Sequence, residues 1–137
     1  MLDYSISCTV WGEQFSPSLA VKKFGLELYD NTEPGEITSR GRWMGKPSPF
    51  GFGTIKLKET GSYQDGLEEI LDILKSHLND LKSIGGNVEA IYINILYSQQ
   101  CNLEFNPKEL KMISDMGIPL CISCCQSDEL SDNDTAD

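Results

Sequence analysis

Residues 62–99, with the sequence SYQDGLEEILDILKSHLNDLKSIGGNVEAIYINILYSQ, decide the fold class because their apolar residues change from one periodicity to another. In the first part, leucines recur every three or four residues, which is the spacing of one face of a helix. Ser62 and Asp65 resemble a capping box at its start, and Gly85 and Gly86 end it. The leucine stripe consists of Leu67, Leu71, Leu74, Leu78 and Leu81.

The second part of this segment, from Asn87, alternates apolar and polar residues and predicts a strand. One face would carry Ile91, Ile93, Ile95 and Tyr97, and the other Ala90, Tyr92 and Asn94. The same period of two predicts strands at residues 2–11, 53–59 and 119–126. In the last of these we expect Leu120, Ile122 and Cys124 to point inward.

Two shorter helices have the same start and stop signals. Ser16 and Pro17 open one and Gly25 ends it, while Asn106 and Pro107 open the other, which ends at Gly117. Each follows a predicted strand, and this suggests a weak internal βα repeat.

The order of these elements predicts a single α+β domain over residues 1–126. Because each strand has one apolar and one polar face, we expect about four strands in a mainly antiparallel or mixed sheet, with three helices on one face. The other face would be open and polar, lined by Ser5, Ser7, Lys56, Lys58, Tyr92, Asn94 and Ser123. Residues 30–53 are rich in proline and glycine and predict a long loop, and residues 127–137 predict an acidic flexible tail.

The chain of 137 residues has a net charge of −10, which favours a cationic partner and repels nucleic acid. Residues 37–58 hold five bases and no acid, so this stretch is +5 and the rest of the chain is −15. No apolar run is long enough for a membrane span and no signal peptide is recognisable. We therefore expect a soluble cytoplasmic protein whose five cysteines are reduced thiols.

The basic stretch GRWMGKPS, residues 41–48, looks like a phosphate-binding loop but lacks its spacing. Gly41 and Gly45 are one residue too close together, Pro47 replaces the residue that would bind magnesium, and a strand follows instead of a helix. Its arginines and aromatics also fit single-stranded nucleic acid, but the net charge opposes that partner. We expect a turn-rich loop in which Trp43 packs against the core and Arg42 covers an aromatic face.

Neither a metal site nor a catalytic group emerges from the remaining motifs. Cys121 and Cys124 in CISCC would point to opposite faces of a strand, so we interpret the cysteines as small core residues and expect no metal or other cofactor. The sequence indicates no nucleophile beside His77, which is the only histidine, and we expect this residue to lie on the flank of the long helix. The sequence therefore favours a binding protein over an enzyme.

Two charged surfaces are candidates for binding. The outer face of the long helix carries Glu68, Glu69, Asp72 and Asp80, which would form either a solvated face or a docking patch for a basic protein. The alternative set consists of Arg42, Lys46, Lys56, Lys58 and Tyr92, which would contact a small anion on the open sheet face and the basic loop.

The chain resembles a bacterial family known as domain of unknown function 4279. The matching pieces are YSISCTVWG, FSPSLAVKKFGLEL, GRWMGKP, GTIKLKE, the LEEILDILKSHLNDLKSIGG helix and LEFNPKELKMISDMGIPLCISC, which together span about residues 3–125. The resemblance implies a small α+β domain without catalytic residues. Members look like the immunity proteins encoded beside polymorphic or contact-dependent toxins.

Two functional hypotheses follow from the charges and the resemblance. The first is an immunity protein that binds and neutralises a cognate toxin, which would be cationic and for example a nuclease. The second is a non-catalytic module that binds a small ligand or anion. Both leave the oligomeric state open, and neither involves a membrane.

Overall fold

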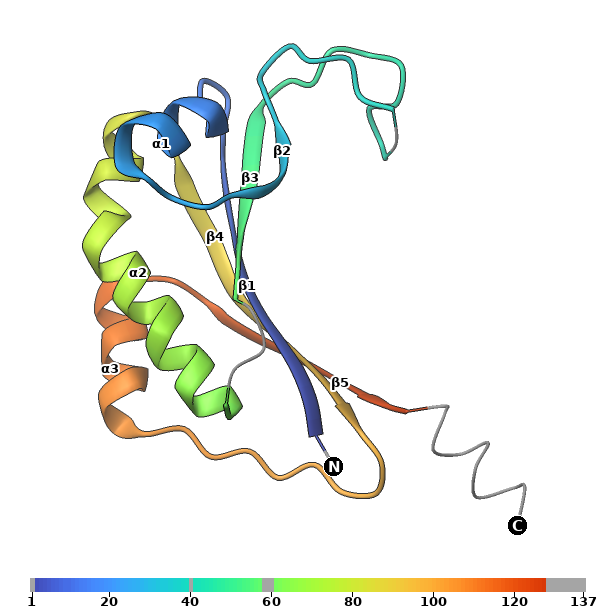
Figure 1. The fold of residues 1–137 in the computed structure, drawn as a ribbon, viewed down its shortest axis with the longest axis vertical. Coiled ribbons are helices and arrows are strands. Elements are labelled where there is room, and N and C mark those ends of the chain that lie inside the picture. Colours follow the sequence, from blue (N-terminus) through green and yellow to red (C-terminus); the bar gives the residue numbers. More distant parts are fainter. Residues whose placement is uncertain (1, 40, 58–60, 128–137) are drawn as a thin grey trace.

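A computed structural model describes residues 2–39, 41–57 and 61–127 and shows an α+β fold, as predicted (Figure 1). In chain order the elements are β1 (Leu2–Gly12), α1 (Pro17–Phe24), β2 (Tyr29–Thr32), β3 (Gly51–Lys56), α2 (Tyr63–Ser83), β4 (Asn87–Tyr97), α3 (Pro107–Met116) and β5 (Leu120–Gln126). The predicted acidic tail lies outside the described residues, apart from Ser127.

The strands form one mixed sheet in the order β2-β3-β1-β4-β5. The long strands β1 and β4 pair in the middle and are antiparallel, as are β1 with β3 and β2 with β3. Only β4 and β5 run parallel among the described pairs, and α3 connects them. The mixed sheet confirms the prediction, with one more strand than the four expected.

Three helices cover one face of this sheet and leave the other open (Figure 1). The long helix α2 begins with the predicted capping box, because the Ser62 hydroxyl accepts from the Asp65 amide and the Asp65 carboxylate accepts from the Ser62 amide. Helices α1 and α3 both start with proline and end at a left-handed glycine, Gly25 and Gly117. The strands that follow differ, since β2 pairs with β3 whereas β5 pairs with β4.

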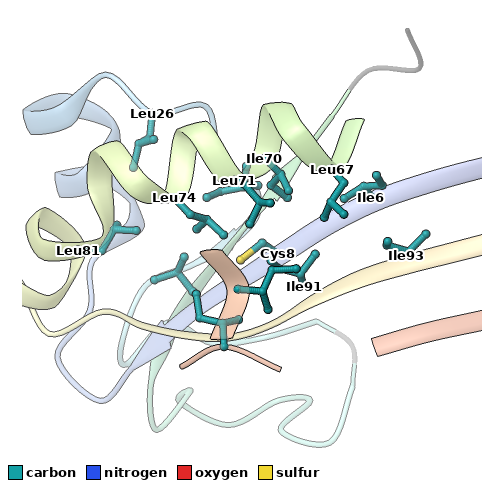
Figure 2. Close-up of a cluster of buried hydrophobic side chains, with 14 of the residues drawn as sticks. Ile6, Cys8, Leu26, Leu67, Ile70, Leu71, Leu74, Leu81, Ile91 and Ile93 are labelled. Atoms are coloured by element: carbon teal, nitrogen blue, oxygen red, sulfur yellow. The ribbon is translucent and has the colours of Figure 1, made fainter. Parts of the chain in front are cut away.

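The core lies between α2 and the two central strands (Figure 2). Figure 2 shows Leu67, Leu71 and Leu74 of the leucine stripe on the side of α2 that faces Cys8 of β1 and Ile91 of β4. Four of its five predicted leucines are fully buried, and Leu78 is half-buried. The buried side chains that α2, β1 and β4 contribute to this core are Ile6, Cys8, Val10, Leu67, Ile70, Leu71, Leu74, Leu81, Ile91, Ile93 and Ile95.

A β-bulge interrupts the pairing of β1 with β4. Cys8 pairs with Ile91 but Val10 pairs with Val88, so Glu89 and Ala90 together oppose the single residue Thr9. Strict alternation from Ile91 would turn Glu89 toward the helices. Instead Val88 packs against the core and Glu89 lines a hollow on the open face.

The structure corrects the prediction for β5. Ile122 is 41% exposed and Cys124 is also exposed, so neither of these residues, which we expected to point inward, is buried in the core. They do share the side of Ile93 and Ile95, but β5 is an edge strand that extends beyond the helix layer (Figure 1). The alternation of residues therefore predicted the correct side of the sheet for Ile122 and Cys124. It did not predict their exposure, which follows because none of the described helices covers this part of β5.

The predicted loop at residues 30–53 also contains more order than expected. It holds most of β2 and the start of β3, and its middle is a small antiparallel arm in which Ile37 pairs with Pro47. The arm extends past the end of the sheet (Figure 1). The expectation that Trp43 packs on the core is wrong, because Trp43 lies in this arm and is 37% exposed. Its ring is covered instead by the Arg42 guanidinium, at 5.5 Å from the ring centroid.

Candidate functional site

The acidic surface of α2 faces away from the sheet. Glu68, Glu69 and Asp72 are exposed, and no ion pair joins them to a base within the described part of the chain. Asp80 is half-buried, and its Oδ2 lies 3.5 Å from Nδ1 of His77. Among the described residues the helix therefore presents three carboxylates without an ion-pair partner, and the fourth predicted acid lies beside His77 further along.

Glu69 and His77 also line a groove between α2 and the segment that follows α1. The groove has a volume of about 560 Å³, and its other walls come from Gly25, Leu26, Glu27, Ile55, Lys56, Leu57 and Ile73. No hydroxyl or thiol side chain is among these residues, so His77 has no nucleophile to activate there. The geometry does not favour a catalytic role for this histidine.

The alternative set of basic residues divides between two places in the structure. Lys56 lies on the open face, where its Nζ is 2.5 Å from Asp30 Oδ2 and 5.8 Å from the centroid of the Tyr29 ring. Arg42 and Lys46 lie in the projecting arm, and Lys58 is outside the described residues. The ion pair with Asp30 neutralises the one base of this set that the structure places on the sheet.

Tyr92 is also on the open face, and the Glu89 carboxylate acts on it. Desolvation, followed by the negative charge of Glu89, raises the pKa of Tyr92 above its ordinary value. Tyr92 therefore stays a neutral hydroxyl at physiological pH. It adds no positive charge to this face.

A group of aromatic residues on the open face was not predicted from the sequence. Tyr92 was the one aromatic residue expected there. Trp11 of β1 pairs with Phe52 of β3, and Phe50 comes just before β3. The ring centroids of Trp11 and Phe50 are 5.8 Å apart at 73°, and those of Phe50 and Phe52 are 5.9 Å apart at 51°. Together with Thr9 and Glu89 they line a hollow of about 470 Å³, which we call the aromatic pocket.

The cysteines do not assemble a metal site. Within the described residues no three histidine, cysteine or acidic side chains are grouped to hold a metal ion. All five cysteines are free. Cys8 is buried and Cys101 packs half-buried against the core, but the interpretation of the three cysteines of β5 as core residues is wrong. Cys121, Cys124 and Cys125 are exposed because they lie on the edge strand β5.

No family model, curated protein or solved structure matches the chain. The resemblance to family 4279 thus remains an expectation from the sequence. Within the part of the chain that the structure describes, none of the helices has both the length and the apolar character needed to cross a bilayer.

Proposed function

We propose that this protein is an immunity protein that binds a cationic bacterial toxin and blocks its activity by protein–protein contact. The observation that carries the proposal is the row of exposed carboxylates on α2, Glu68, Glu69 and Asp72, which have no ion-pair partner among the residues that the structure describes. Exposed charges of one sign speed the encounter with an oppositely charged partner and fix its orientation. The net charge of −10 acts in the same direction.

The rigidity of α2 supports its use as a docking element. Its inner face is fixed by four fully buried leucine-stripe residues and its start by the capping box at Ser62. A helix held in this way presents its outer carboxylates without a loss of backbone freedom on binding, which is a main cost of association. The acids can therefore contribute to affinity as well as to the rate of encounter.

The alternative proposal, an anion-binding module, has weaker support. On the open face Lys56 is paired with Asp30, and Tyr92 adjoins the Glu89 carboxylate. An anion bound there would have to compete with Asp30 and tolerate Glu89 nearby. The charges of the described residues on this face thus favour a positively charged ligand over a negative one.

The test uses the toxin encoded by the neighbouring gene, produced in cells together with this protein. Co-expression should protect the cells, and the triple variant Glu68→Gln/Glu69→Gln/Asp72→Asn should bind the toxin more slowly and protect less. The matched control Glu13→Gln/Glu36→Gln/Glu104→Gln removes three exposed acids elsewhere and should protect like the unaltered protein. Absence of protection by the unaltered protein would rule out the proposed function, and equal loss in both variants would rule out the α2 surface.

A further inference from the structure

We infer that the aromatic pocket on the open sheet face binds an arginine side chain presented by a protein partner. The pocket lies on the sheet face that carries Thr9, Trp11 and Phe52. Helix α2 covers the other face of the sheet (Figure 1). The inference therefore concerns a second binding site, and it stands whether or not the protein neutralises a toxin.

The walls of the pocket are aromatic faces held at steep angles to one another. Trp11, which is 39% exposed, meets Phe50 edge to face, and Phe52 continues the row along β3. Such side chains expose π-faces that attract a cation within about 6 Å of the ring centroid. A planar guanidinium is the protein cation that stacks best on these faces.

Glu89 supplies the charge that selects a cation. It is exposed and lines the same hollow as Trp11, Phe50 and Phe52. An ionised carboxylate has two oxygens and can accept several hydrogen bonds. Its lone pairs match the paired N–H donors of a guanidinium, which bind carboxylates in a bidentate manner.

The bulge in β4 is what brings this carboxylate to the aromatics. Because Glu89 and Ala90 both oppose Thr9, Glu89 lies on the same sheet face as Trp11. Without the bulge, strict alternation would have turned Glu89 toward the helices. Bulges recur beside functional sites because they redirect a side chain in this way. The neighbouring Val88 returns to the core side, so the redirection is local.

Charge complementarity identifies the occupant. No basic side chain lines the pocket among the described residues, so the Glu89 carboxylate has no cation of this chain in the hollow. Two of the described bases have partners elsewhere. Lys56 forms an ion pair with Asp30, and the Arg42 guanidinium covers the Trp43 ring. An arginine satisfies both features of the pocket at once, the aromatic faces and the carboxylate. An apolar residue would leave Glu89 without a partner, and an anion would be repelled.

The experiment titrates the ¹⁵N-labelled protein with the tripeptide acetyl-Gly-Arg-Gly-amide and follows the indole N–H signals by NMR. The chain has two tryptophans, so Trp43 in the projecting arm is an internal reference for Trp11 in the pocket. The indole signal of Trp11 and the backbone amide signal of Phe52 should move in a saturable manner, while the indole signal of Trp43 stays in place. The same peptide with citrulline, which has the shape of arginine without its charge, should cause much smaller shifts.

Two exposed acids give matched variants that differ only in position. Glu89→Gln should weaken binding of the arginine peptide about tenfold, because a charge-assisted hydrogen bond is lost. Glu104→Gln makes the same change in net charge beside the start of α2, where the Glu104 amide donates to the Tyr63 hydroxyl, and should leave the affinity unaltered. Trp11→Ala should abolish the shifts at Phe52, and the spread of the amide signals will show whether this variant is folded.

Four results would overturn the inference. They are equal shifts with the citrulline peptide, equal weakening by the two glutamine variants, shifts confined to α2, and shifts of the Trp11 signal on dilution without peptide. The last would identify a second copy of this chain as the occupant. Since no toxin enters the experiment, its outcome is independent of the co-expression test.

Discussion

The Sγ atoms of Cys101 and Cys124 lie 3.7 Å apart, although the two residues are 23 positions apart in the chain. Cys124 is on the edge strand β5, and Cys101 is half-buried in the segment between β4 and α3. Partial burial and the hydrogen bond with Cys124 raise the pKa of the Cys101 thiol. Cys101 therefore stays protonated and weakly nucleophilic near neutral pH, although its sulfur lies close to that of Cys124.

We predict that oxidised glutathione converts this pair into a disulfide at alkaline pH. The two thiols lose two protons and two electrons, and the oxidised glutathione is reduced to two molecules of glutathione. Peptide mapping without reductant should recover Cys101 linked to Cys124, and Cys101→Ser should abolish the link while Cys121→Ser retains it. A dominant link between Cys121 and Cys125 would contradict the prediction.

Stability should fall at high pH because of Cys8. Burial, with a smaller contribution from Glu89, raises the pKa of this thiol from 9.0 to about 12. The folded state therefore keeps its proton where the unfolded chain has lost it, and stability decreases as the pH rises from 9.0 toward about 12. The slope contributed by one such group is at most about 1.4 kcal/mol per pH unit.

Urea unfolding at a series of pH values measures this slope. Tyr92 has a raised pKa with the same sign, so the contribution of Cys8 is the difference between the unaltered protein and Cys8→Ala. The variant should show a shallower decline. Identical slopes for the two proteins would show that the Cys8 thiol does not control stability in this range.

Truncation of the leucine stripe at its centre should be strongly destabilising. Leu74 is fully buried between α2 and the sheet, so Leu74→Ala removes buried apolar surface and leaves a cavity at a cost of about 2–5 kcal/mol. Leu110→Ala, at a 44% exposed position of α3, is the matched control and should cost far less. Free energies of unfolding from urea titrations test both, and similar losses would contradict the assigned core.

The two helix caps should respond differently to alanine. The Ser62 side chain accepts a hydrogen bond at the start of α2, whereas the Asn106 side chain makes no such bond at the start of α3. Ser62→Ala should therefore cost about 1 kcal/mol and Asn106→Ala clearly less. The comparison is made by urea unfolding, and a larger loss for Asn106→Ala would argue against the observed cap geometry.

Trp43→Ala should leave stability almost unchanged, within about 0.5 kcal/mol, because the ring is exposed and contacts Arg42 in the projecting arm. The arm itself is held by hydrogen bonds that do not involve the Trp43 side chain, such as the Thr38 hydroxyl donating to the Trp43 carbonyl at 2.6 Å, and these survive the change. Phe15→Ala provides the contrast, since Phe15 is fully buried and its loss should cost about 3–5 kcal/mol. Thermal or urea unfolding separates the two results.

The periodic part of the sequence was sufficient to predict most of the fold. The helix ends at Ser62 and Gly25 and the buried faces of β1 and β4 were confirmed because their signals are local and repeated. The strand β2 was missed because its four residues, YDNT, lack apolar alternation and are ordered by pairing with β3. Such an edge strand depends on a partner that is distant in sequence.

The candidate sites show the same division between local and distant information. The exposure of Glu68, Glu69 and Asp72 could be predicted from their positions relative to the leucine stripe. The aromatic pocket could not, because it depends on the pairing of Trp11 with Phe52 and on a bulge. Neither feature leaves a periodic signal, so only the assembled sheet reveals that Glu89 accompanies these rings.

The bulge at Glu89 and Ala90 places one extra residue in β4 opposite Thr9. Losing one of the two would restore regular pairing and leave Val88 opposite Val10, on the core side. A single-residue deletion is therefore compatible with the sheet at this point. A homologue with such a gap would be expected to keep the fold, and to keep the carboxylate of the pocket only where the acid is the residue that remains.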